Sequence, residues 1–362
     1  MIESTCPHSI MNQIRASDAV DMRTCRGDNL ARLLRRGVLG LFVAATAATP
    51  SAAGQAYPVR AITVIVPFAA GGPTDIVTRI VTGHLEKRLG QQIIVENVVG
   101  AGGTTAAIRA TRAAPDGYTL LMGHMGTHGS ALAAYPQLVY DPVKDFAPIG
   151  LVVRTPVLVV VRPGLPVHDL ADLIRYSSSR AGTVSMAHAG FGSISHATCT
   201  LLNTIGAIQP TTKAFQGTGP ALKALVAGRV DYMCDQIVGA APRVKTGEVR
   251  ALAISSARRS SILPNVPTAA DAGVPDFEVS AWIALFAPKD TPPHIVQDLN
   301  AALGHALDDP EIRQALGSLG AEIPLAEERS PSSLTALVER EIARWRPLSR
   351  PAAASDGARV RQ

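Results

Sequence analysis

Short apolar runs alternate with longer amphipathic stretches along most of the chain. The first run, residues 62–66, stops at Pro67, and residues 75–89 then carry apolar side chains at helical spacing. Further apolar runs predict strands at 93–98, 119–123, 156–161, 183–187, 211–215, 230–234 and 251–255. Strands that alternate with helices in this way predict βαβ units and an α/β fold, with mostly parallel sheets flanked by helices.

The last third of the chain has a different pattern. A strand at 281–287 is followed by three amphipathic helices at 292–307, 310–319 and 332–345. A length of 362 residues favours two lobes over one small domain. We therefore expect lobe 1 at 57–153, lobe 2 at 154–280, a return to lobe 1 at 281–349 and a disordered tail at 350–362.

The N-terminus has the pattern of an export signal. Arg32, Arg35 and Arg36 precede an apolar run at 37–48, and small residues follow. This order predicts a secretory signal peptide and a periplasmic product, because the run is shorter than the roughly 20 residues that span a membrane. Residues 1–56 are thus expected to be a signal peptide and N-terminal extension. Initiation at Met1 or Met22, and cleavage after Ala53 or Ala56, remain alternatives.

Composition excludes some classes of function. The net charge is +5, only 4% of residues are aromatic, and Lys and Arg are scattered, which gives nucleic-acid binding little support. The cysteines lack the spacing of a metal site, and no cofactor motif is present, so no metal or cofactor is expected. Cys199 and Cys234 would remain after export; a disulfide and two buried thiols are both compatible with the sequence.

Two glycine-rich segments join a strand to a helix. The first, residues 67–75, contains Gly71 and Gly72, and the second, residues 189–196, contains Ser193. Free N–H groups at a helix start attract anions, although plain turns also use glycine at such junctions. If the two segments face one cleft, they would hold an anion from both sides.

Other polar residues follow predicted strands, where open α/β sheets bind ligands. They are Thr127, His128, residues 216–219, Asp235 and Gln236. No G-x-S-x-G, H-E-x-x-H or metal-ligand pattern accompanies them. Ser193, His196 and Asp235 make an awkward triad because the serine and histidine share one helical turn. The pattern favours binding over catalysis.

The order of these motifs resembles a known family. The matching segments are Pro-Phe-x-x-Gly-Gly-x-x-Asp at 67–75, Val-Glu-Asn at 95–97, Gly-Ala-Gly-Gly at 100–103, 115–121, 140–142, 146–149, the Gly192-Ser193 loop, Gly-Arg-Val-Asp at 228–231, Pro-Asn-Val-Pro-Thr at 264–268 and 282–288. They are similar to the extracytoplasmic solute receptors of tripartite tricarboxylate transporters, the Bug receptors. The resemblance covers essentially the whole chain after residue 56.

This resemblance implies a periplasmic two-lobed binding protein with a Venus flytrap, type II-like topology. It implies that a ligand carboxylate lies between the two glycine-rich loops, and that membrane permease subunits are partners. The residues carried over are Phe68, Ala70, Gly71, Gly72, Thr74, Asp75, Gly190, Gly192, Ser193, His196 and Asp235. Thr127 and His128 are added as side-pocket residues that would help to select the ligand.

The sequence does not identify the ligand. A dicarboxylate, tricarboxylate, aromatic acid or acidic amino acid would fit, and we expect a monomer. Asp75 would favour an amino-acid ligand if it faces the pocket and a simple acid if it caps the helix. Ala69-Ala70 and the histidines at 124 and 128 depart from the family pattern. A ligand sensor and an enzyme of the same fold are the alternative hypotheses.

Overall fold

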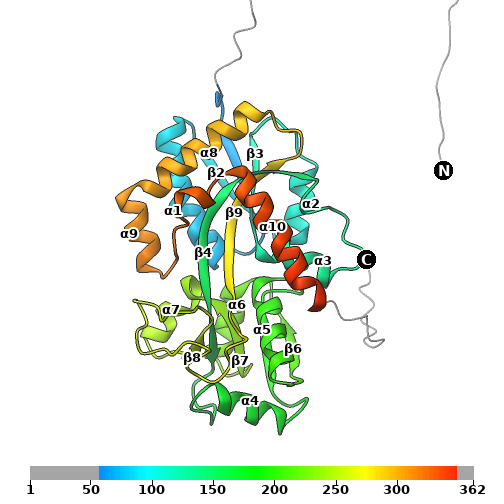
Figure 1. Ribbon diagram of the computed structural model, residues 1–362, viewed down its shortest axis with the longest axis vertical. Helices are drawn as coiled ribbons and strands as arrows, with labels where there is room; N and C mark the ends of the chain where they lie inside the picture. Colours follow the sequence, from blue (N-terminus) through cyan, green and yellow to red (C-terminus); the bar gives the residue numbers. More distant parts are fainter. Residues whose placement is uncertain (1–56, 349–362) are drawn as a thin grey trace, which may run out of the picture. The chain divides into compact units, whose positions relative to one another are not determined.

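The computed structural model describes residues 57–348 (Figure 1), so the expected signal peptide and C-terminal tail lie outside the described residues. A nine-stranded sheet runs through this part of the chain in the order β2-β1-β3-β9-β4-β7-β5-β6, with β8 paired to β4. The strands are β1 (Ile62–Val66), β2 (Ile93–Asn97), β3 (Thr119–His124), β4 (Phe146–Val161), β5 (Ser185–His188), β6 (Thr211–Ala214), β7 (Tyr232–Gln236), β8 (Arg250–Ile254) and β9 (Ser280–Pro288).

Ten α-helices of the described residues cover this sheet. They are α1 (Pro73–Leu89), α2 (Thr104–Thr111), α3 (Ala131–Ala134), α4 (Leu170–Ser178), α5 (Ile194–Ile205), α6 (Thr218–Val226), α7 (Ile237–Lys245), α8 (Pro293–Asp308), α9 (Pro310–Ser318) and α10 (Pro331–Trp345). Short helical turns lie at η1 (Ala101–Gly103), η2 (Met125–Ser130), η3 (Ala326–Glu328) and η4 (Arg346–Leu348). None of the described helices has the length and apolarity needed to cross a membrane.

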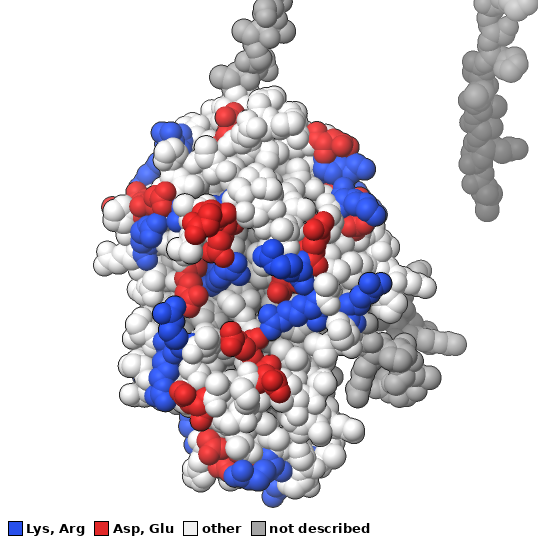
Figure 2. Space-filling view, viewed as in Figure 1, with Lys and Arg blue, Asp and Glu red and all other residues white. Residues whose placement is uncertain are grey.

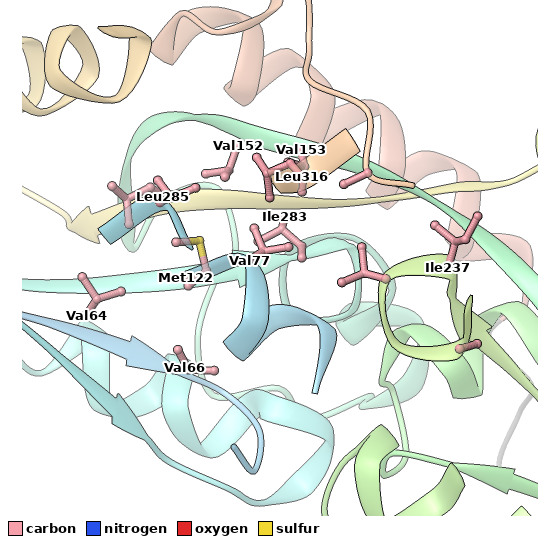
Figure 3. Packing of buried hydrophobic residues seen from close by; sticks show 14 of the residues in the cluster. Val64, Val66, Val77, Met122, Val152, Val153, Ile237, Ile283, Leu285 and Leu316 are labelled. Atoms are coloured by element: carbon pink, nitrogen blue, oxygen red, sulfur yellow. The ribbon is translucent and has the colours of Figure 1, made fainter. Parts of the chain in front are cut away.

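Strand alternation places apolar side chains on both faces of the sheet. Val64 and Val66 of β1 belong to one buried cluster, whereas Ile65 between them belongs to another. Figure 3 shows Val64, Val66 and Met122 beside Val77 of α1 in the first cluster. A sheet that is covered on both faces explains why the strands read as continuous apolar runs.

The long strand β4 belongs to two parts of the sheet, because its two ends pair with different strands. Its residues from Phe146 to Pro156 pair with β9, and those from Val157 to Val161 pair with β7 and β8. These pairings are antiparallel, whereas β1 is parallel to β2 and β3, and β5 is parallel to β6 and β7. The predicted α/β class is confirmed. The strand expected at 156–161 begins ten residues earlier, at Phe146.

The surface carries charges of both signs. Figure 2 shows Lys and Arg side chains interspersed with Asp and Glu on the visible face of the described residues. Several neighbours form ion pairs, among them Arg154 with Glu328 and Arg313 with Asp308. Interspersed signs are typical of a soluble surface rather than of a polyanion-binding stripe.

Candidate functional site

The first glycine-rich loop begins where β1 ends and leads into α1. Gly72 is the N-cap of α1, no side chain caps this helix start, and Pro73 occupies its first turn. Proline suits this place because its missing N–H would have no partner inside the helix. Gly72 packs closely, since a Cβ there would lie 3.4 Å from Thr218 Oγ1. The N-terminal N–H groups of α1 are therefore not used by a side-chain cap.

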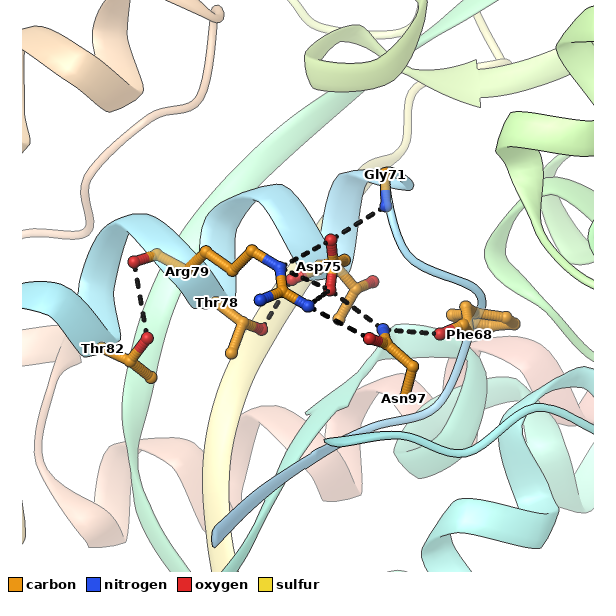
Figure 4. A network of polar contacts seen from close by, with 8 residues as sticks. Phe68, Gly71, Asp75, Thr78, Arg79, Thr82 and Asn97 are labelled. Carbon is orange, nitrogen blue, oxygen red and sulfur yellow. Dashed lines mark hydrogen bonds and ion pairs between the residues drawn. The ribbon is translucent and has the colours of Figure 1, made fainter. Parts of the chain in front are cut away.

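Asp75 organises this loop from the first turn of α1 (Figure 4). Its carboxylate accepts hydrogen bonds from Gly71 N at 2.8 Å, from Arg79 Nε at 3.0 and 3.1 Å, and from Asn97 Nδ2 at 2.9 Å. Asn97 also donates to Phe68 O. Burial opposes ionisation of Asp75, but these hydrogen bonds outweigh it and hold its pKa below the ordinary value. Asp75 is thus occupied by neighbours in its own half of the fold.

The second glycine-rich loop connects β5 to α5. Ser193 is the N-cap of α5, and its Oγ accepts from His196 N at 3.3 Å. Ser195 Oγ lies 3.2 Å from Ser193 Oγ and accepts from Ala189 N at 2.9 Å. His196 Nδ1 accepts a long hydrogen bond from Gly192 N at 3.4 Å. These bonds fold the loop back on the first turn of its helix.

Four helix starts converge on one small cavity of about 10 Å³ between the two loops. They belong to α1, α5, α6 and α7. The cavity is lined by Phe68, Gly72, Pro73, Thr74, Ala189, Ser193, Ile194, Ser195, Thr218 and Gln236. None of these carries a formal charge, so the local field comes from helix N-termini and hydroxyl groups. Such a field favours an anion.

A second cavity, of about 290 Å³, adjoins the first and shares Phe68 and Ala189 with it. It is lined by Phe68, residues 100–103, Tyr135, residues 189–191, Ala214, Phe215 and Gln216. Four of these residues are aromatic, although aromatics make up only 4% of the chain. The site therefore has a narrow end that contains hydroxyl and amide side chains, here called the polar end, and a wider end that contains aromatic rings and glycines.

Contacts across the site close it. Tyr135 Oη donates to Phe191 O at 2.7 Å, Ser130 Oγ donates to Gly192 O at 3.3 Å, and Ala69 N donates to Gln216 O at 3.4 Å. A cavity of about 10 Å³ holds roughly one water. A small organic acid can enter the polar end only if these contacts open.

Some of the thirteen predicted site residues line one of the two cavities, and the others do not. Phe68, Gly72, Thr74, Gly190 and Ser193 line one or both cavities. Ala70, Gly71, Asp75, Thr127, His128, Gly192, His196 and Asp235 line neither in this conformation. Gly192 and His196 nevertheless shape the second loop, and Gly71 and Asp75 shape the first. Ser195 lines the smaller cavity and Tyr135 lines the larger one, and neither was predicted as a site residue.

Thr127 and His128 lie in the buried turn η2 after β3. Thr127 Oγ1 is 2.9 Å from His128 Nδ1, and the His128 ring stacks on Phe286 with 3.8 Å between centroids. His124 lies nearer the site, because its ring stacks on Phe68 at 5.0 Å. Its Nδ1 accepts from Gly126 N and Thr127 N, and burial lowers its pKa to about 3. His124 is therefore neutral at physiological pH.

A disulfide ties two elements of the site together. Cys199 of α5 and Cys234 of β7 are joined, with 5.4 Å between their Cα atoms. The disulfide is thus the alternative that the structure adopts. It links the helix that starts at Ser193 to the strand that carries Asp235.

The fold, with a cavity between two strand-to-helix loops, is that of the periplasmic binding proteins among the similar solved structures. The family model described as the tripartite tricarboxylate transporter family receptor matches residues 77–352. MatC from Rhodopseudomonas palustris, solved with bound malate, is 51% identical, with a TM-score of 0.80 over 81% of this chain and 100% of that chain. The periplasmic binding protein BugD is 38% identical, with a TM-score of 0.78 over 81% of this chain and 97% of that one.

A curated relative is a Bug protein as well. BugT from Bordetella pertussis is 33% identical over 318 residues, which is 88% of this chain and 96% of that protein. The chain belongs to the tripartite tricarboxylate transporter receptor family, whose members are periplasmic solute-binding receptors. It is a receptor that binds a small organic carboxylate for uptake by a transporter of this type.

Proposed function

We propose that the ligand is a four-carbon dicarboxylate of the malate type. The main support is the convergence of four helix N-termini on a cavity without charged side chains, where two carboxylates would find N–H and hydroxyl donors. The similarity to MatC, which was solved with malate, points to the same class. Asp75 supports a simple acid over an amino acid, because Arg79 and Asn97 already hold its carboxylate.

An aromatic acid is the second candidate. The wider cavity presents Phe68, Phe191 and Phe215 next to the polar end. A planar ring there would bury apolar surface while its carboxylate entered the polar end. The two candidates differ in which cavity dominates the binding free energy.

The receptor would bind its ligand and would not catalyse a reaction on it. Ser193 Oγ accepts from the backbone N–H of His196, and the imidazole accepts from Gly192 N, so the ring is not aligned as a base for the serine. The lobes would divide near Val153 and again near Ala281. The receptor would act as a monomer after removal of its signal peptide and would deliver its ligand to membrane permease subunits. A sensor would bind equally well but would lack permease genes as neighbours.

The test is a thermal-shift and calorimetric screen of the chain from Tyr57 onward. The ligands are malate, succinate, adipate, benzoate, glutamate and glucose. A ligand at a hundredfold excess over its Kd stabilises the folded state by about 2.7 kcal/mol, so the true class should raise Tm by several degrees. Malate and succinate are expected to do so. A response only to benzoate would favour the aromatic candidate, and a response only to glucose would overturn the carboxylate assignment.

A further inference from the structure

Asp235 is a buried carboxyl group with an unsatisfied oxygen. The residue is 1% exposed at the end of β7. Its Oδ1 accepts from Gln236 N at 2.9 Å, whereas its Oδ2 has no hydrogen-bond partner among the described residues. An ionised carboxylate in this position would lose its hydration without compensation, which costs several kcal/mol.

The unsatisfied oxygen lies where the two parts of the fold meet. A Cβ built on Gly239 of α7 would lie 2.9 Å from Asp235 Oδ2 and equally 2.9 Å from Pro73 Cγ of α1. The carboxyl group, α7 and the first residue of α1 therefore share one tightly filled gap. Pro73 and Gln236 both line the polar cavity, so Asp235 lies just behind the cavity wall.

The neighbouring elements supply no compensating charge. On α1, Asp75 and Arg79 are paired with each other. On α7, the basic residues Arg243 and Lys245 lie in the last turn, away from the helix start. On β4, Leu158 is the register partner of Asp235. Arg162, which follows β4, is paired with Asp231.

On α6, which packs against β7 and α7, the basic residue Lys223 is exposed in the last turn. Two histidines lie on the strand and helix next to β7. His188 ends β5, the strand beside β7, and burial lowers its pKa. His196 of α5 lies against His188, with 4.8 Å between ring centroids, and burial lowers its pKa to about 4. Both rings are neutral near pH 7. Neither offers Asp235 a positive charge.

We infer that closure of the cleft on its ligand takes up one proton from solvent, and that Asp235 holds this proton. The inference rests on the proposed function, since a ligand must drive the closure. When the cleft opens, Pro73 moves away and water reaches the carboxyl group, which then ionises. When the cleft closes, the group is buried as the neutral acid, and the proton returns to solvent on release of the ligand.

The direction of the pH dependence follows from the two states. An exposed aspartate has a pKa of about 3.9, whereas burial raises the pKa of Asp235 in the closed form to about 8. Between these values the closed form binds more protons than the open form. Ligand affinity should therefore fall as pH rises, by up to about tenfold per pH unit, and should level off above pH 8.

The experiment is calorimetry with malate on the protein purified from the periplasm of an expressing cell. Titrations at pH 6.5 to 7.5 in buffers of different ionisation enthalpy count the protons taken up on binding. About one proton is expected for the wild type and about none for Asp235→Asn. The Kd of the wild type should rise about tenfold over this range, whereas that of Asp235→Asn should stay nearly constant.

Asp231→Asn is the matched control, because Asp231 precedes the same strand and is already ion-paired with Arg162. It should retain the proton uptake of the wild type. Binding of malate with buffer-independent enthalpy in the wild type would overturn the inference and leave the proposed function standing. This count needs no variant, so a misfolded Asp235→Asn would not obscure it. Failure of malate, succinate and adipate to bind at all would overturn both.

Discussion

The phenol of Tyr135, just after α3, donates a 2.7 Å hydrogen bond to the backbone carbonyl of Phe191, 56 residues further along the chain. The two rings also meet edge to face, with 5.6 Å between centroids. Tyr135 follows the β3 region, and Phe191 belongs to the loop that starts α5. This pair therefore joins the segment after α3 to the loop that starts α5 at the wall of the wider cavity.

We expect Tyr135→Phe to weaken ligand binding about fivefold, mainly through faster release. The substitution removes one hydrogen bond of about 1 kcal/mol from the closed state and leaves the ring in place. Stopped-flow release rates and calorimetric Kd values measure the effect. Tyr176→Phe is the control, because Tyr176 lies on α4, lines neither cavity and stacks with Arg180. Equal release rates for the wild type and Tyr135→Phe would contradict the prediction.

Gly102→Ala should abolish tight binding while leaving the chain folded. A Cβ at Gly102 would lie 1.8 Å from Phe191 O, so the closed contact could not form. We expect at least a hundredfold loss of affinity. Gly164→Ala is the control: its φ of +73° resembles the +62° of Gly102, but nothing lies within 4 Å of its Cβ position.

Both glycine variants should lower the free energy of unfolding by about 1 to 2 kcal/mol, the cost of a left-handed alanine. Only Gly102→Ala should also lose the ligand. Unimpaired malate binding by Gly102→Ala would mean that these segments do not meet in the bound state.

Ser193→Ala should reduce both the free energy of unfolding and the affinity for the ligand. The same substitution at the N-cap of another helix distinguishes these two effects. Ser193 caps α5 inside the polar cavity, whereas Ser330 caps α10 with a 3.0 Å hydrogen bond from Ser333 N and lines neither cavity. Each loss should cost about 1 kcal/mol of unfolding free energy. Ser193→Ala is expected to raise Kd about tenfold in addition, and Ser330→Ala to leave it unchanged. Equal Kd values for both variants would remove Ser193 from the ligand site.

Asp75→Asn should destabilise the protein at neutral pH by about 1 to 3 kcal/mol, because it removes the charged acceptor of Gly71, Arg79 and Asn97. The folded pKa of Asp75 lies below its unfolded value of about 3.9. Its contribution is therefore fully present above that value and is lost as pH falls through the folded pKa. The difference in Tm between the wild type and the variant should stay constant from pH 7 down to about pH 4 and should narrow only below that. Asp116→Asn, which breaks an exposed pair with Arg60, should change Tm little.

Local signals in the sequence predicted the strand and helix that frame the first loop. Pro67 and the Gly71-Gly72 pair mark the end of β1 and the start of α1, and the structure places both boundaries within two residues of the prediction. The start of β4 was missed because Pro148 and Gly150 interrupt its apolar pattern. They lie where the register with β9 shifts, so an irregular strand was indistinguishable from a loop.

The two loops of the site could be predicted from the sequence, but the contacts between distant segments that form the site could not. The loops at Gly72 and Ser193 lie at strand ends, and this position alone nominated them. The contact of Tyr135 with Phe191 depends on how the chain brings distant segments together, which no local pattern encodes. Helix α7 was missed as well, because Pro242 within it reads as a helix breaker. The pairing of Cys199 with Cys234 needed the geometry of α5 against β7.

Strand β9 fills the place between β3 and β4 in the finished sheet, yet it begins only at Ser280. A nascent chain that has emerged as far as β4 has synthesised β1, β2 and β3 but still lacks the strand that joins them to the rest of the sheet. The N-terminal half therefore cannot complete its fold on the ribosome until most of the polypeptide has been made. In this family of periplasmic receptors, the strand that unites the sheet is therefore among the last parts of the polypeptide to be made.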